Sequence, residues 1–328
     1  MAFNINKIER CFYLLMAFLA LAAPIFGSDI HFSSGASSLR IPFELENNLI
    51  FIRVSVNGSR PLRFAVDSGA SINVLDLQRA RSFGLNLQPV GNAGGIGAQN
   101  NSAFLLTDKV SLGLPGVVLS DQTMIAISLN LVSQCIDQIT DNKGGASGSK
   151  ENGFDGVLGR GFWDRFVVEI NYASHMIDLY DPKDYVYKGK GKIVPLDLGL
   201  GVAIVLAKIR GDRGRSVQAR LVVDTGGGGP IPLTLNNEFA DKLGILPPVK
   251  TLTPANECGA SGVAEGTSYQ GIVAGFQLAN LKLDRPRTFF RKNPTGGGYD
   301  GSVGGIAFQK FKVIFDYSRS RMILESAR

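Results

Sequence analysis

Residues 63–71 read RFAVDSGAS, in which Asp67 ends an apolar run and is followed at once by Ser68 and Gly69. Asp, Ser and Gly are also the residues that ordinary turns select, so one such triplet does not decide a function. A second triplet stands in RLVVDTGGG at residues 220–228. The meaning of the first therefore depends on how the two are related.

The two triplets belong to a longer internal repeat. Three pairs of blocks match: IPFEL (41–45) with VPLDL (194–198), LQRARSFGL (77–85) with NEFADKLGI (237–245), and residues 154–181 with residues 299–326. The first pair is offset by 153 residues (194 − 41), whereas Asp67 and Asp224 are 157 apart (224 − 67). One longer hairpin in the second copy explains the difference. The repeat predicts two lobes built on one plan.

Most of each copy shows apolar residues at every second position, rich in Val, Ile and Phe and broken by Asn-Gly and Gly-rich turns. That pattern is typical of β-strands, and helical patterns are few and short. We therefore expect an all-β protein with two pseudo-twofold-related barrel lobes around a central cleft. The expected division is a signal peptide at 1–28, an N-terminal lobe at 38–190 and a C-terminal lobe at 191–328.

The first 28 residues have the form of a secretory signal peptide. Lys7 and Arg10 precede an apolar block at residues 12–26, which is short for a membrane span and ends in small residues. The alternative is an uncleaved anchor. Either reading places the bulk of the protein outside the cytoplasm. The signal peptide predicts a secreted or periplasmic protein, with no stable membrane insertion unless the signal is retained.

The remaining composition argues against several kinds of partner and cofactor. The formal net charge of +6 is spread without a dense Lys/Arg run, so nucleic-acid binding has little support. Cys135 and Cys258 could pair in an oxidising compartment, and they show no metal-ligand spacing. We expect neither a metal nor a cofactor.

A pseudo-twofold axis would bring Asp67 and Asp224 together across the cleft. Two ionised carboxylates about 3 Å apart would repel by about 5 kcal/mol at an effective dielectric near 20, so the pair holds one proton over a wide pH range. The ionised acid can take a proton from water while the other donates to the scissile carbonyl, as in aspartic proteases. Gly69 and Gly226 allow the tight turns beneath the carboxyls. Ser68 and Thr225 are expected to hydrogen-bond across the axis.

The sequence resembles the retropepsin-like aspartic proteases, particularly bacterial secreted ones. The resemblance rests on apolar-apolar-Asp-Ser/Thr-Gly-Ala, a Gly-rich segment and then Asp-Gly-Val-Leu-Gly, and it covers nearly all of the mature chain, once per lobe. It implies that Asp67 and Asp224 are catalytic. It also implies that residues 157–159 and 302–304 pack behind them, while Asp155 and Asp300 are more typical of turn formers.

In the family a hairpin flap closes over the substrate. Residues 90–104 are the counterpart here, with residues 257–268 at the matching place in the second lobe. The flap prediction centres on Gly94, Gly95, Ile96 and Gly97, against the alternative of an ordinary flexible loop.

Two departures from the pepsin pattern concern the catalytic loops. Pepsin-like enzymes carry Ser or Thr three residues after each Asp, where this chain has Ala70 and Gly227. Loss of that donor should raise the apparent pKa values of the pair, so we expect activity at milder acidity than pepsin shows. The second loop also has Gly228 where the first has Ser71.

Other hydrolase and binding classes fit less well. His31 and His175 are the only histidines, which disfavours a Ser-His-Asp triad or a zinc site. VDTGGGGP lacks the Gly-Lys-Ser/Thr ending of a phosphate loop. Glycosidase carboxylates stand farther apart and need not occupy repeated triplets.

The sequence therefore predicts a monomeric aspartic endopeptidase that cleaves polypeptides with water activated between Asp67 and Asp224. The alternative is a degenerate protease fold that binds peptides without cleaving them.

Overall fold

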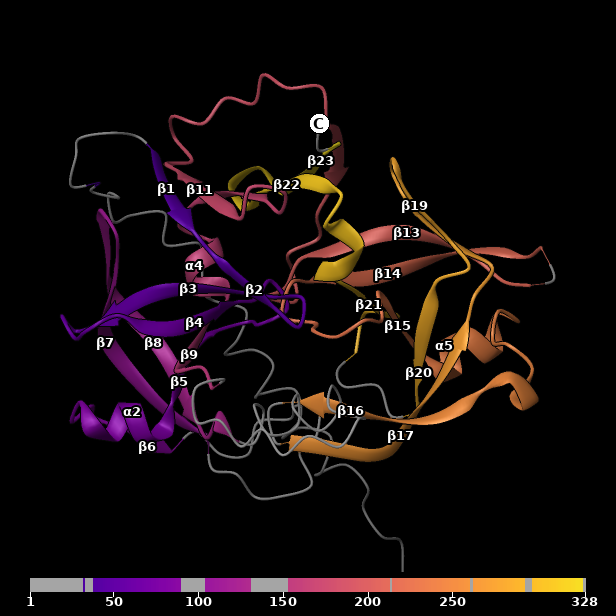
Figure 1. Cartoon of the computed structure of the whole chain (residues 1–328), viewed down its shortest axis with the longest axis horizontal. Coiled ribbons are helices and arrows are strands. Elements are labelled where there is room, and N and C mark those ends of the chain that lie inside the picture. Colours follow the sequence, from indigo (N-terminus) through magenta and orange to yellow (C-terminus); the bar gives the residue numbers. More distant parts are fainter. Residues whose placement is uncertain are drawn as a thin grey trace, which may run out of the picture.

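The computed structural model describes Phe32 and residues 38–89, 104–130, 153–212, 214–259, 262–292 and 297–326. The protein is all-β with short helices, which confirms the predicted fold class (Figure 1). Its strands form three sheets. Among the described residues, no helix has the length and apolar character needed to cross a bilayer.

The first lobe is an eight-stranded sheet in the order β2-β3-β4-β9-β5-β8-β7-β6. An additional pairing of β3 with β7 closes the sheet on itself, which gives the lobe its barrel-like form. The strands are β2 (Glu44–Glu46), β3 (Leu49–Val56), β4 (Leu62–Val66), β5 (Asn73–Asp76), β6 (Gln88–Pro89), β7 (Leu105–Leu114), β8 (Val117–Ile127) and β9 (Gly156–Leu158).

The second lobe is a nine-stranded sheet in the order β16-β17-β20-β15-β21-β14-β13-β18-β19. Its strands are β13 (Ile204–Arg210), β14 (Ser216–Asp224), β15 (Leu233–Asn236), β16 (Thr253–Gly259), β17 (Gly262–Ile272), β18 (Gly275–Leu278), β19 (Leu281–Asp284), β20 (Arg287–Arg291) and β21 (Gly301–Gly304).

The central strand pairings of the two lobes correspond one for one. Strand β4 pairs parallel with β9 as β14 does with β21, and β5 pairs antiparallel with β9 as β15 does with β21. The parallel pairs β5–β8 and β15–β20 also match. Asp67 follows β4 and Asp224 ends β14, so the two acids stand at equivalent points of equivalent sheets.

The hairpin of β13 and β14 is longer than that of β3 and β4, which agrees with the larger offset between Asp67 and Asp224. In the first lobe the β3–β4 ladder ends at Val54↔Leu62. The equivalent pair in the second lobe is Ala207↔Ala219, and the β13–β14 ladder continues beyond it to Arg210↔Ser216.

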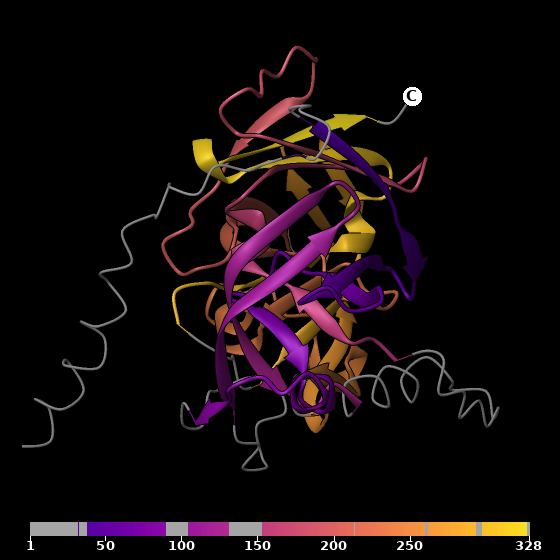
Figure 2. The ribbon, with the colours of Figure 1, turned by 90° about the vertical axis from the view of Figure 1, so that its left-hand side faces the viewer.

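A third, six-stranded sheet was not anticipated from the sequence. Its order is β1-β11-β10-β22-β23-β12, with β1 (Ser38–Pro42), β10 (Val167–Asn171) and β11 (Met176–Tyr180) from the first half of the chain. The second half supplies β12 (Lys192–Pro195), β22 (Phe311–Asp316) and β23 (Arg321–Ser326). The halves join where β10 pairs with β22, and the sheet lies above both lobes in Figure 1 and Figure 2. The predicted division at residue 190 stays a prediction, and it falls between β11 and β12.

Short helices and turns connect the strands: α2 (Leu77–Ser82), α4 (Arg160–Trp163), α5 (Asn237–Lys242), η1 (Val249–Thr251), η2 (Gly305–Phe308) and η3 (Tyr317–Arg319). Helices α2 and α5 occupy the two short helical patterns expected from the repeat. The side chain of Asp76 caps α2 by accepting hydrogen bonds from the backbone N–H groups of Gln78 and Arg79.

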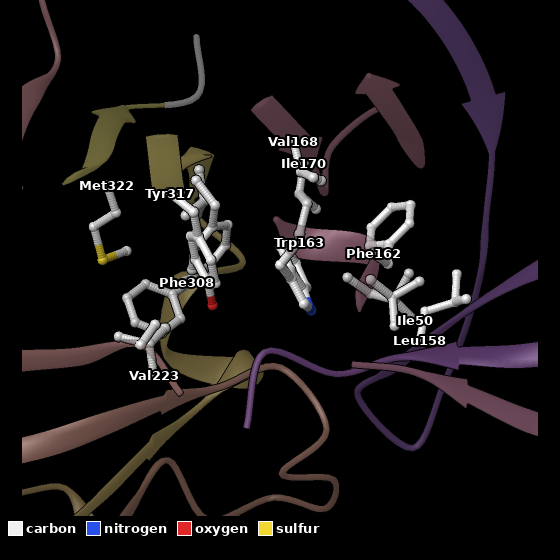
Figure 3. Close-up of a cluster of buried hydrophobic side chains, with 14 of the residues drawn as sticks. Ile50, Leu158, Phe162, Trp163, Val168, Ile170, Val223, Phe308, Tyr317 and Met322 are labelled. Atoms are coloured by element: carbon white, nitrogen blue, oxygen red, sulfur yellow. The ribbon is translucent and has the colours of Figure 1, made fainter. Parts of the chain in front are cut away.

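A hydrophobic core fills the space between the six-stranded sheet and the two lobes (Figure 3). Trp163 lies at its centre with only 1% of its surface exposed, as expected for a core residue. Its ring centroid is 4.8 Å from that of Phe315 and 5.9 Å from that of Tyr317. Since Trp163 comes from the first half and its partners from the second, this core holds the two halves together.

Candidate active site

The loops that carry Asp67 and Asp224 begin at the ends of β4 and β14. A further Asp side chain holds the backbone of each of these strands. The carboxylate of Asp155 accepts a hydrogen bond from the Arg63 N–H (2.9 Å), and that of Asp300 accepts one from the Arg220 N–H (2.8 Å). Arg79 also pairs with Asp155 at 2.7 Å. Asp155 and Asp300 therefore hold the strands that lead to the loops, which fits their reading as turn formers.

Ser68 and Thr225 join the two loops through reciprocal hydrogen bonds. The Ser68 hydroxyl donates to the Val223 carbonyl (2.6 Å) and accepts from the Thr225 N–H (3.1 Å). The Thr225 hydroxyl donates to the Val66 carbonyl (2.8 Å) and accepts from the Ser68 N–H (3.0 Å). Both side chains are 1% exposed. The loops of the two lobes are thus locked together by four buried hydrogen bonds.

The carboxyl groups of Asp67 and Asp224 hydrogen-bond to each other beside this lock. The Gly69 N–H donates to Asp67 Oδ1 at 2.7 Å. A Cβ on Gly69 would lie 2.8 Å from Asp224 Oδ1, and one on Gly226 would collide with the Asp67 carboxyl. Glycine is required at both positions because each loop passes directly against the acid of the other lobe.

Burial and mutual repulsion favour the protonated forms of the pair. Burial raises the pKa of Asp67, and the negative charge of Asp224 raises it further. Burial also raises the pKa of Asp224, but the hydrogen bond from Asp67 and the positive charge of Arg291 lower it, as do the N–H groups of Gly227 and Gly226. The pair therefore holds a proton, and the charge of Arg291 favours ionisation at Asp224.

The back of the first loop is held by the helix that follows β9. Trp163 Nε1 donates to the Asp67 carbonyl at 2.9 Å, and the Arg160 N–H donates to the Ala70 carbonyl at 2.9 Å. The sequence analysis did not anticipate this bond. The sequence indicates this bond only in that a Trp follows shortly after Leu158-Gly159.

The second loop has a different composition and different supports. The Gly227 N–H donates to the Asp224 carbonyl at 3.2 Å, while the Gly228 N–H donates to the Gly226 carbonyl at 3.0 Å. Gly229 has a φ of +83°, in the left-handed region that favours glycine. The run of glycines thus follows a path that larger residues would not take without strain.

The predicted flaps lie largely outside the described residues. Gly94, Gly95, Ile96 and Gly97 all fall there, so the first flap stays a prediction. In the second lobe β16 and β17 form a hairpin, seen at the bottom of Figure 1, around residues 260–261, which are also outside. No group of three or more His, Cys, Asp or Glu that could hold a metal occurs in the described part of the chain.

Replacing Thr225 by Val should destabilise the protein by about 1 to 3 kcal/mol, because the buried Ser68 N–H and Val66 carbonyl lose their partner at nearly unchanged side-chain volume. Thr225→Ser keeps the hydroxyl and should recover most of that loss. Urea unfolding of both variants checks this, with Ser71→Ala, at an exposed position of the first loop, as the control. Equal stability of Thr225→Val and wild type would contradict the interpretation.

Comparison with known proteins found one family match, in the first lobe. Residues 52–162 match the family model described as aspartyl protease, a span that runs from β3 to α4 and contains the Asp67 loop. A search of curated proteins found no match. The family match supports the placement of this chain among the retropepsin-like aspartic proteases.

Proposed function

We propose that the protein is an aspartic endopeptidase that hydrolyses peptide bonds with water activated between Asp67 and Asp224. One observation carries the proposal: two carboxyl groups from equivalent loops hydrogen-bond to each other, and a buried Ser68–Thr225 lock fixes their loops. The aspartyl protease domain over residues 52–162 supports a peptidase at the level of the family.

In the proposed reaction Asp224 is the base and Asp67 the acid, because the charge of Arg291 favours ionisation at Asp224. Asp224, the ionised member, takes a proton from a water molecule whose oxygen attacks the peptide carbonyl carbon. Asp67 gives its proton to the carbonyl oxygen, which yields a tetrahedral diol. On collapse the C–N bond breaks, the leaving nitrogen takes the proton held by Asp224, and a diol hydroxyl returns a proton to Asp67. The pair ends as it began, so no further reactant is consumed besides water.

The proposed substrate, single-chain state and location of the enzyme are consistent with this reaction. The substrate is a polypeptide, and one chain suffices because both lobes belong to it. The signal-like residues 1–28 would direct the enzyme to the periplasm or the exterior. The correspondence of strand pairings between the two sheets supports an origin by internal duplication.

Asp67→Asn and Asp224→Asn should each lower kcat for cleavage of a denatured protein by about 10² to 10⁴, because each removes one partner of the proton transfer. Asp108→Asn, the same change at an exposed strand position, is the matched control and should leave kcat unchanged. If wild type binds peptides across pH 3 to 7 but cleaves none, the non-catalytic alternative replaces this proposal.

The pH dependence of activity should reflect the shared proton. Because the pKa values of both acids are raised, the pair keeps its proton to higher pH than two isolated carboxyls would. We expect kcat/KM to peak at milder acidity than pepsin requires and to fall as the shared proton is lost. A peak near pH 2 in a pH-rate profile would be incompatible with this expectation.

The contribution of Asp67 to stability should fall as pH rises, whereas a carboxylate in a salt bridge usually contributes more as pH rises. The folded pKa of Asp67 lies above its unfolded value near 3.9, so its contribution is fully present below about pH 4 and is lost as pH rises through the folded pKa. Asn mimics the neutral acid. The Tm of Asp67→Asn should therefore match wild type at pH 3 and exceed it increasingly toward pH 7 in calorimetry. A Tm difference that stays constant with pH would contradict the raised pKa.

A further inference from the structure

Beyond Thr225, the loop that follows Asp224 needs support from outside because its next four residues have no side chain. Residues 226–229 are all glycine. Glycine loses more conformational freedom on ordering than any other residue, so such a loop is costly to hold in one shape. The position of Asp224 depends on that shape, since the N–H groups of Gly226 and Gly227 bear on its carboxyl.

A turn from the opposite lobe supplies that support. The Gly229 N–H donates to the Asn47 carbonyl at 2.8 Å, and the Gly229 carbonyl accepts from Asn48 Nδ2 at 2.8 Å. Both backbone groups of Gly229 are therefore bound by residues 47–48. At Gly228, a Cβ would lie 3.1 Å from Leu49 Cγ, so the loop also packs closely on the start of β3.

The conformation of the turn explains why Asn stands at both positions. Asn47 and Asn48 have φ values of 50° and 64°, and they link β2 to β3 at the pair Glu46↔Leu49. A two-residue hairpin turn with both φ values positive favours Asn and Gly. Glycine would satisfy this backbone equally well, so the turn alone does not require the Asn48 amide.

The amide of Asn48 is held in one orientation from its other side. Gln309 Nε2 donates to Asn48 Oδ1 at 2.7 Å, and Gln309 directly follows η2 in the second lobe. The amide accepts from Gln309 and donates to Gly229, which makes a continuous chain of hydrogen bonds from Gln309 to the glycine loop. Both ends of the chain lie in the second lobe, and its central link comes from the first.

The first loop is held in a different way. It contains Ala70, Ser71 and Ile72, and its Ala70 carbonyl accepts from the Arg160 N–H of the same lobe. A Cβ on Gly159 would collide with the Ile72 carbonyl, so the loop packs directly on its own β9 end. The two loops share the Ser68–Thr225 lock, but the glycine loop adds an anchor from the other lobe.

We propose that Asn48 is a positioning residue for catalysis: its side-chain amide, oriented by Gln309, anchors the glycine loop that carries Asp224 and so fixes that acid against Asp67. The catalytic part of this inference rests on the proposed function. The anchoring part does not, and it is measured separately below.

The test compares Asn48→Gly with Asn57→Gly. Asn57 also has a positive φ (49°), lies in a turn, and forms one side-chain hydrogen bond to backbone, from the Ser111 N–H at 2.8 Å. Both substitutions remove a side-chain hydrogen bond to backbone at a position of positive φ, and Asn48→Gly also removes the acceptor of Gln309, but only Asn48 contacts the loop. We expect Asn48→Gly to lower kcat about 3- to 10-fold with KM within about twofold, and Asn57→Gly to leave kcat unchanged.

Hydrogen–deuterium exchange gives a readout that does not depend on activity. Peptides covering residues 225–231 should exchange faster in Asn48→Gly than in wild type, and at the wild-type rate in Asn57→Gly. Asn48→Asp, which keeps the acceptor for Gln309 but sets an oxygen against the Gly229 carbonyl, should loosen the loop at least as much. Gln309→Met, which removes the orienting donor at similar length, should have a smaller effect in the same direction.

Unchanged loop exchange in Asn48→Gly, or an equal loss of kcat in the Asn48 and Asn57 variants, would overturn the inference. If wild type cleaves no substrate while Asn48→Gly still loosens the loop, anchoring by Asn48 stands and the proposed function fails. The two failures are thereby distinguished.

Discussion

The geometry of the site depends on the reciprocal hydrogen bonds between Ser68 and Thr225. Each hydroxyl donates to the carbonyl of a strand end in the other lobe and accepts from the N–H of the other hydroxyl residue. All of these groups are buried, so water cannot replace a lost partner, and displacement of either lobe would leave unsatisfied polar groups. The meeting of Asp67 and Asp224 follows, because each acid directly precedes one of the two locked residues.

The rest of the fold keeps the lobes close enough for that lock to form. The pairing of β10 with β22 makes one sheet from both halves, and the Trp163 core beneath it is shared in the same way. Trp163 connects this core to the Asp67 loop, because its ring packs on Phe315 while its Nε1–H donates to the Asp67 carbonyl. A single side chain thus couples the packing between the halves to the backbone of the loop that carries Asp67.

The fold class and the equivalence of the two triplets could be predicted from the sequence. The six-stranded sheet and the contacts between the lobes could not. Strands follow from alternating apolar residues, and the repeat makes Asp67 and Asp224 equivalent. Alternation does not reveal which strand lies beside which, so the six-stranded sheet could not be anticipated. Asn48 reads as an ordinary turn residue, since its partner Gly229 is 181 positions away and is brought near only by the packing of the lobes.

A single chain can also give its two acids different surroundings, although their triplets are nearly the same. In a strictly symmetric pair, either carboxyl could carry the shared proton. Here burial raises the pKa of both, but the charge of Arg291 acts on Asp224 and favours its ionised form. The supports differ as well, with Arg160 of the same lobe behind Ala70 and Asn48 of the opposite lobe beside Gly229. The differences between the lobes outside the triplets therefore give the two acids different surroundings.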